Sequence, residues 1–271
     1  MAHAEGSEDL AVAGQKRTID LNADVGESYG AWQIGHDGEI MPYITSANVA
    51  CGGHAGDPNV MAATVKLACG HGVSVGAHPG YPDIPGFGRR SISFSPDEIR
   101  QFVLYQVGAL WAIARAQGVE LRHVKAHGAL YNLASRDRKV AEAIARAVHD
   151  FSRDLPLVCL AGSVAEHVSR ELGLVTLAEG FADRAYEPNG DLRDRKLPGS
   201  VYHEPERVAQ QVVSLASGQV RAVDDNSIAL YVDTICLHSD TPDAALFAQV
   251  ARKALEDTGY TVAVPRLAEG G

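Results

Sequence analysis

Short β-rich segments alternate with amphipathic helical segments along almost the whole chain, and this alternation constrains the fold more than any other feature. It is typical of a parallel sheet, in which each strand pair is joined by a crossover helix and both faces of the sheet are covered. Strands are predicted at residues 18–24, 45–50, 73–78, 121–126, 157–161, 174–177 and 229–237, with a weaker candidate at 261–264. About seven such units suit a closed or nearly closed parallel (β/α) barrel, and a doubly wound open α/β sheet is the alternative.

The helical segments carry clear boundary signals. Asp57 followed by Pro58 is a typical helix start, because the aspartate can cap free backbone amides and proline fits the first helical position. Ser95, Pro96 and Glu98 form a capping box with the same proline placement. Helices are predicted from 58 to Gly70 or Gly72, from 96 to Gly118, and over 140–151, 162–172, 208–216 and 247–255.

The composition is that of a folded, water-exposed domain. With 271 residues, of which 46% are apolar and 21% charged, the chain can bury a sizeable core, so disorder of the whole chain is excluded. Residues 1–17 lack a long apolar stretch, and we expect them to be a flexible leader before a single barrel domain at 18–271. No run of about 18 uncharged apolar residues is present, so we expect no membrane span and a cytoplasmic location.

Charge, cysteine spacing and missing motifs exclude several function classes. A formal net charge of -10 argues against nucleic-acid binding, which needs a basic face. The four cysteines contain no C-x-x-C pair, so reduced thiols are expected rather than a zinc cage or redox pair. The chain lacks a P-loop, G-x-G-x-x-G and H-E-x-x-H. One G-x-S-x-G match at 72–76 lies inside a predicted strand, so it is not a nucleophile elbow.

Polar side chains recur at the carboxyl ends of the predicted strands, where the active site of a parallel barrel lies. In chain order these are Asn22, Asp24, Glu27, Asn48, His54, His78, Lys125, His127, Glu179, Asp183, Arg184, Glu187 and His238. Inside a barrel such groups need hydrogen bonds or a function to compensate for burial. The alternative for Asp20, Asn22 and Asp24 is the wet face of an antiparallel strand.

Three features have both a functional and a structural interpretation. Gly52 and Gly53 precede a helix start, where backbone amides can bind a carboxylate or phosphate, but the pair also suits a tight turn. Lys125 can hold an anion or polarise a carbonyl, or it can extend to solvent. The histidines can serve the site or simply pack. If a divalent metal is bound, Asp24, His54 and His78 have suitable ligand atoms, although no helical spacing singles them out.

Long segments spread over the chain resemble the LamB/YcsF family, which includes one component, the A-type subunit, of prokaryotic 5-oxoprolinase. They are D-L-N-A-D-V-G-E at 20–27, S-A-N-V-A-C-G-G-H-A-G-D at 46–57, G-A-H-P-G-Y-P-D at 76–83, G-F-G-R-R at 86–90, V-K-A-H-G-A-L-Y-N at 124–132 and E-G-F-A-D-R-A-Y at 179–186. The resemblance covers nearly the whole chain, from about residue 18 to about residue 265. Ala126 stands where the family has proline. This replacement should relax the backbone locally and casts little doubt on function.

The resemblance implies a barrel of the glycoside hydrolase/deacetylase type. It also implies ATP-dependent opening of 5-oxoproline to L-glutamate, with ATP as co-substrate and two further subunits of B and C type as partners. The missing P-loop fits nucleotide chemistry that is shared with, or performed by, those partners. Two alternatives remain: a stand-alone metal-dependent amidase or carbohydrate deacetylase, and a non-catalytic partner subunit.

Residue roles follow from side-chain chemistry rather than from the family. Asp24 or His54 would be the general base for water, and Lys125 and His127 would stabilise charge on the carbonyl or phosphoryl oxygen. The remaining residues are expected to bind substrate. The amides of Gly52 and Gly53 or the guanidinium of Arg184 would take its carboxylate, Asn22 and Asn48 would orient the ring, and His78 would line the site.

Overall fold

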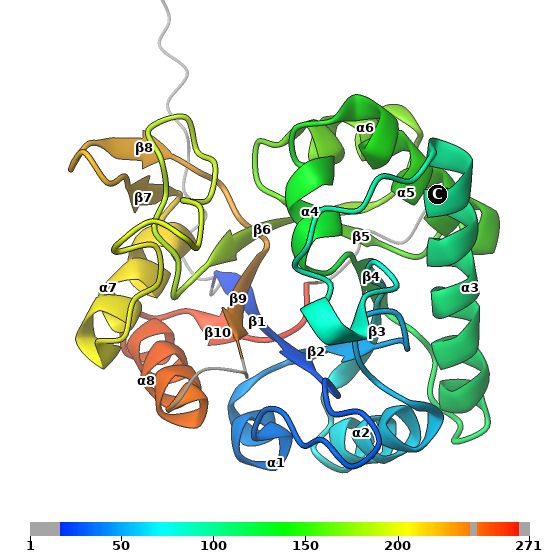
Figure 1. Ribbon diagram of the computed structural model, residues 1–271. Helices are drawn as coiled ribbons and strands as arrows, with labels where there is room; N and C mark the ends of the chain where they lie inside the picture. Colours follow the sequence, from blue (N-terminus) through cyan, green and yellow to red (C-terminus); the bar gives the residue numbers. More distant parts are fainter. Residues whose placement is uncertain (1–16, 239–242, 266–271) are drawn as a thin grey trace, which may run out of the picture.

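The computed structural model describes residues 17–238 and 243–265, which contain a closed barrel of seven parallel strands (Figure 1). In barrel order the strands are β1 (Thr18–Val25), β2 (Ser46–Ala50), β3 (Ser74–His78), β4 (His123–Lys125), β5 (Leu157–Leu160), β6 (Thr176–Phe181) and β9 (Thr234–His238). Strand β9 pairs with both β6 and β1 and so closes the ring. The predicted seven-stranded parallel barrel is confirmed, and the open sheet is excluded. All but the last residue of the predicted leader, 1–17, lies outside the described residues.

Helices surround the ring of strands (Figure 1). They are α1 (Asp37–Ile40), α2 (Pro58–Gly70), α3 (Pro96–Arg115), α4 (Gly128–Ala134), α5 (Arg138–Phe151), α6 (Val164–Glu171), α7 (Pro205–Ala216) and α8 (Ala244–Asp257), with the 3-10 turns η1 (Met41–Tyr43) and η2 (Ile84–Gly86). The predicted cap at Asp57 and the capping box at Ser95 and Glu98 are both formed. Within the described ranges, no helix has the length and apolar character needed to cross a membrane.

The strand predicted at 229–237 is correct only from residue 234 onward. Residues 227–229 form β8 (Ser227–Ala229), which pairs antiparallel with β7 (Gln219–Arg221) in a hairpin, and the barrel strand begins only at Thr234. Between them the backbone amide of Leu230 bonds to Gly218, whereas that of Asp233 bonds to Ala178 in the barrel. The start of the apolar run therefore belongs to the hairpin and its end to the barrel. The strand predicted at 174–177 is likewise displaced, since β6 runs from Thr176 to Phe181.

The barrel interior is polar, and its side chains form stacked layers. In the layer nearest the amino ends of the strands, Asp20 accepts hydrogen bonds of 2.5–2.8 Å from three hydroxyl groups. These belong to Thr45, Ser46 and Thr234. In the next layer Asn22 donates to Glu179 at 3.0 Å, which links β1 to β6 across the barrel. Because β1 pairs in parallel with each of its neighbours, the wet antiparallel face is excluded.

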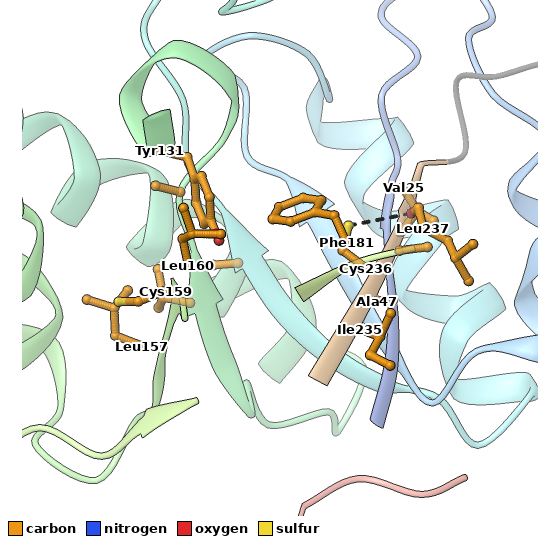
Figure 2. Close-up of a cluster of buried hydrophobic side chains, with 14 of the residues drawn as sticks. Val25, Ala47, Tyr131, Leu157, Cys159, Leu160, Phe181, Ile235, Cys236 and Leu237 are labelled. Carbon is orange, nitrogen blue, oxygen red and sulfur yellow. Dashed lines mark hydrogen bonds between the residues drawn. The ribbon is translucent and has the colours of Figure 1, made fainter. Parts of the chain in front are cut away.

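Apolar side chains pack on the outside of the strands and near one part of the barrel mouth. Leu21, Val49 and Val124 point outward into the layer between strands and helices and are fully buried. At the mouth the ring of Phe181 points toward Tyr131 of α4, with ring centroids 5.8 Å apart (Figure 2). The polar interior is therefore bounded by apolar packing that excludes water from its sides.

A glycine in β3 leaves room for a buried imidazole in the second layer. A Cβ at Gly76 would overlap the ring of His123, which contacts the Asn48 carboxamide at 2.6 Å. Gly76→Ala is therefore expected to lower the free energy of unfolding by about 1–3 kcal/mol, measured by urea denaturation. Gly108→Ala in the middle of α3 is the matched control, because nothing lies near its Cβ position and alanine should stabilise that helix by up to about 1 kcal/mol. Equal effects at both positions would contradict this packing argument.

Candidate active site

A pocket of about 900 Å³ opens at the carboxyl ends of the strands. Its floor contains Asp24 of β1, His78 of β3 and Lys125 of β4. His127, which follows β4 and precedes α4, and His238 at the end of β9 also line it. The structure thus brings together polar groups from five places in the sequence, as the strand-end pattern predicts.

Lys125 lies at the centre of this floor and is 2% exposed. Its ammonium nitrogen lies 3.0 Å from Asp24 Oδ1 and 2.8 Å from Glu179 Oε1. It also lies 3.2 Å from Asn22 Oδ1 and 3.0 Å from the sulfur of Cys236. Burial alone would lower the pKa of Lys125, but the charges of Asp24 and Glu179 outweigh burial and hold that pKa well above its usual value. The ammonium group therefore stays charged at neutral pH.

Asp24 is held in its ionised form by its neighbours. Burial by itself would raise the pKa of Asp24, but His78 and Lys125 together hold it well below the usual range. Oδ1 accepts from Lys125 and, at 2.8 Å, from the side-chain amide of Asn48. Oδ2 lies 3.3 Å from Nε2 of His78. A carboxylate in this state can accept a proton, but it is a weak base.

Three residues of this centre have no role in the sequence-based assignment. Glu179 accepts a 2.6 Å hydrogen bond from the phenol of Tyr131, and Cys236 contacts Lys125. Burial, reinforced by Glu179, holds the pKa of Tyr131 well above its usual value, so the phenol remains a donor. The position of Glu179 at a strand end was a usable signal. Tyr131 lies on α4, a helix too short for its apolar period to be recognised.

A second cluster beside Asp24 consists of one carboxylate and three imidazoles. Glu27 Oε1 lies 3.2 Å from His54 Nε2 and 3.4 Å from His127 Nδ1. His127 Nδ1 in turn lies 3.0 Å from His78 Nε2. Burial, with the neighbouring His78, lowers the pKa of His54 well below its usual value, and burial does the same for His127. One ligand atom from each of the four residues lies within 4.8 Å of the others, so the cluster could hold a metal ion.

The far side of the pocket is built by a buried, hydrogen-bonded pair of a histidine and a carboxylate. His238 Nδ1 lies 2.8 Å from Asp183 Oδ2, and its Nε2 lies 2.8 Å from the guanidinium of Arg195. Burial would raise the pKa of Asp183, but His238 and Arg195 outweigh it and lower that pKa. The pair fixes the loop after β6 against β9 and keeps Arg195 at the pocket.

Asn22 and Asn48 lie one layer below the floor, where they bond to each other at 2.7 Å. Gly52 and Gly53 do not line the pocket. The amide of Gly52 donates to the carbonyl of Ala55, so the loop forms a tight turn as in the structural interpretation. Gly53 has no room for a Cβ beside Gly80 and Gln106.

Arg184 lines the pocket, but its guanidinium also braces the loop after β6. It donates to the backbone carbonyls of Ser200 at 3.1 Å and Arg193 at 2.6 Å. Its predicted contact with a substrate carboxylate would therefore have to be made alongside these structural bonds.

All four cysteines are free, as expected from their spacing.

The model of the LamB/YcsF family matches residues 19–269. The chain belongs to the LamB/YcsF family. It is 57% identical over 250 residues to the A-type subunit of 5-oxoprolinase from Chloroflexus aggregans, an alignment that covers 92% of this chain and 99% of that protein. To the corresponding 5-oxoprolinase subunit of Pyrococcus furiosus it is 50% identical over 245 residues, which cover 90% of this chain and 96% of that protein.

Among solved structures, this LamB/YcsF chain is similar to the lactam utilization protein from Thermus thermophilus. The TM-score is 0.87 at 49% identity, over 91% of this chain and 99% of that one. A protein from Enterococcus faecalis that is named a putative cellobiose-phosphate cleavage protein matches with a TM-score of 0.55 at 13% identity, over 92% of this chain and 98% of that one. At this identity the second likeness shows the shared fold alone.

One buried histidine of the barrel interior gives a prediction about pH. Burial, reinforced by the charge of Lys125, lowers the pKa of His123 from 6.5 to about 3. Below pH 6.5 the unfolded chain therefore binds a proton that the folded chain does not. His123 therefore leaves the free energy of unfolding unaffected above that pH. As the pH is lowered below it, the free energy of unfolding falls by up to about 1.4 kcal/mol per pH unit. His123→Gln should flatten the pH dependence of urea denaturation by this amount, and an unchanged slope would contradict the prediction.

Proposed function

We propose that this chain is the A-type subunit of an ATP-dependent 5-oxoprolinase, which opens 5-oxoproline to L-glutamate together with subunits of B and C type. The observation that carries the proposal is similarity along the full length of proteins with that name, 57% in one case over 99% of the relative. The pocket supports it, because an ionised carboxylate and a buried ammonium group lie at its floor.

Ring opening requires water to add to the lactam carbonyl and the C–N bond to break. The ring nitrogen then takes a proton and becomes the amine of glutamate. An unactivated lactam is a poor electrophile, and the neighbours of Asp24 keep it a weak base. We therefore infer that the carbonyl is activated before water attacks, as phosphorylation of the lactam oxygen by ATP, with release of ADP, would do. Asp24 would then accept the proton of the attacking water. Breaking the C–N bond would leave an acyl phosphate, which a second water hydrolyses to glutamate and inorganic phosphate.

Lys125 serves this chemistry through its charge more than through a free hydrogen bond. Its ammonium group already contacts Asp24, Glu179 and Asn22, so it holds the carboxylates of Asp24 and Glu179 in place. It also places a fixed positive charge below the reacting centre, which would stabilise negative charge on a carbonyl or phosphoryl oxygen. His127 borders the same pocket and is proposed for the same role. His54 contacts Glu27 and not the pocket, so Asp24 is the preferred base.

The lining of the pocket suits an anion, although the chain as a whole carries a formal net charge of -10. Several basic side chains border it: Arg89, Arg136, Arg184, Arg193, Arg195 and Lys196. Clustered basic groups attract carboxylates and phosphoryl groups. A lactam carboxylate, alone or on an activated ring, would be drawn into such a site.

The test is an assay of 5-oxoproline loss and ADP release by this chain with and without its B-type and C-type partners. We expect turnover only when all subunits and ATP are present, because the sequence carries no P-loop of its own. Ring opening by this chain alone without ATP would instead identify a stand-alone amidase, which the histidine cluster around Glu27 favours as the second candidate. Full activity of the partners without this chain would contradict the proposed function.

A further inference from the structure

The imidazole cluster beside Asp24 presents lone pairs to one another. His78 donates its Nδ1 proton to the carbonyl of Lys125 at 2.8 Å, and His127 donates its Nε2 proton to the carbonyl of Phe87 at 2.9 Å. When both rings are neutral, the other nitrogen of each ring carries a lone pair. These two nitrogens lie 3.0 Å apart, and the carboxylate of Glu27 faces one of them at 3.4 Å. Acceptors packed this closely need a positive charge between them.

From this geometry we propose that Glu27, His78 and His127 bind one divalent transition-metal ion at the side of the pocket next to Asp24. Two nitrogens and one oxygen are a donor set that suits Zn²⁺. With metal–ligand bonds of about 2.0–2.1 Å, the ligand atoms of a tetrahedral site lie about 3.3–3.4 Å apart. The observed separations of 3.0 Å and 3.4 Å are near this spacing, and the ligand atoms all lie within 4.8 Å of one another. The backbone bonds that fix both rings are the outer partners that metal-binding histidines usually have.

His54 is not one of the ligands. Its ring stacks on that of His127, with centroids 3.6 Å apart and planes 2° from parallel. Lone pairs lie in the plane of an imidazole, so two stacked rings cannot direct them at one ion. His54 instead faces Glu27 Oε1 with Nε2 at 3.2 Å, where an Nε2–H group orients the carboxylate. It is a positioning residue.

The ligand set therefore differs from the sequence-based candidates Asp24, His54 and His78, of which only His78 is kept. Asp24 stands at the border of the site, with Oδ2 3.3 Å from the ligating nitrogen of His78. Two glycines shape the site, since a Cβ at Gly80 or Gly88 would contact the His54 ring or its Cβ at 2.6–2.7 Å. The geometry alone supports the binding site, whereas the role of the ion rests on the proposed function. There an ion would act as a Lewis acid beside the reacting carbonyl.

Metal binding to the full chain tests the site without any assay of turnover. We expect EDTA-treated protein to take up one equivalent of Zn²⁺ by isothermal titration and elemental analysis, with a rise in Tm. Glu27→Gln and His127→Gln should each lose stoichiometric binding. Co²⁺ should give a visible d–d spectrum in the wild-type protein and not in these variants.

Two further variants separate ligands from neighbours. His54→Asn should keep the stoichiometry and weaken affinity by about 10–100-fold, as expected for an outer partner. His123→Gln, which changes a buried histidine in contact with Asn48 rather than with this cluster, should leave binding unchanged. Circular dichroism establishes which variants fold, and the wild-type titration decides the question even if one does not.

A chain that takes up no Zn²⁺, Co²⁺ or Mn²⁺ would overturn the proposal and show that a proton on His78 joins the acceptors instead. So would stoichiometric binding that persists without Glu27 and His127. These outcomes are separate from the proposed function. If an EDTA-treated complex turned over 5-oxoproline at the full rate, a role for the metal in turnover would be ruled out and the proposed function would stand. If a metal-loaded complex left 5-oxoproline intact, the proposed function would be ruled out and the metal site would stand.

Discussion

Asp24→Asn is expected to lower the turnover of 5-oxoproline by the reconstituted enzyme by about 10²–10⁴-fold, which is the usual effect of losing a general base. The substitution keeps the shape of the side chain but removes the group that accepts a proton from water. Lys125 keeps its contact with Glu179, so the barrel should remain folded. Steady-state release of glutamate by the complete complex measures the loss.

Asp20→Asn is the matched control for this variant. Asp20 lies on the same face of β1, four residues earlier, and is also buried, but it bonds to hydroxyl groups at the opposite end of the barrel. Burial raises the pKa of Asp20, so an amide is a mild change there. We expect lower stability at most, with turnover within a few-fold of wild type. Equal losses of turnover in both variants would show that barrel integrity, and not proton transfer, explains the effect.

Lys125→Met is expected to abolish turnover and to lower the free energy of unfolding by about 3–5 kcal/mol, because it leaves Asp24 and Glu179 buried without their shared cation. Urea denaturation and the coupled assay measure the two effects separately.

The double variant Lys125→Met/Glu179→Gln separates stability from chemistry. Neutralising Glu179 removes one of the two carboxylate charges that lose their cation, so the double variant should regain much of the lost stability while turnover stays absent. If the double variant were as active as the wild type, the proposed role of the Lys125 charge would be wrong. If it were less stable than the single variant, the charge-compensation argument would be wrong.

The sequence predicted the barrel because its signals are local. Alternation of Asp20, Asn22 and Asp24 with apolar residues marks a strand with one polar face, and helix caps such as Asp57 mark boundaries. The barrel strand was predicted to begin too early because residues 229–237 are one largely apolar run with no turn residue strong enough to divide it. The two strands of the β7–β8 hairpin are only three residues long, which is too short for alternation to mark them. Only the contact of residue 233 with β6 shows where the barrel strand begins.

The site was predicted as a set of strand ends but not as a set of partners. Which carboxylate meets Lys125, and which imidazoles meet Glu27, depends on side chains that are distant in sequence and adjacent in the barrel. The same limit explains why the predicted role of Gly52 and Gly53 in binding a substrate carboxylate does not fit the structure. The rule for helix starts correctly placed the cap at Asp57, but the bond from Gly52 to the Ala55 carbonyl uses an amide that was expected to face a ligand.

The most direct measurement of the central claim is a crystal structure of the assembled enzyme with 5-oxoproline or a non-reactive analogue. The lactam is predicted in the pocket at the carboxyl ends of the strands, with its carbonyl carbon beside Asp24 and its carboxylate against the basic lining. A ring bound wholly within a partner subunit, far from Asp24 and Lys125, would contradict the claim that this chain opens the lactam.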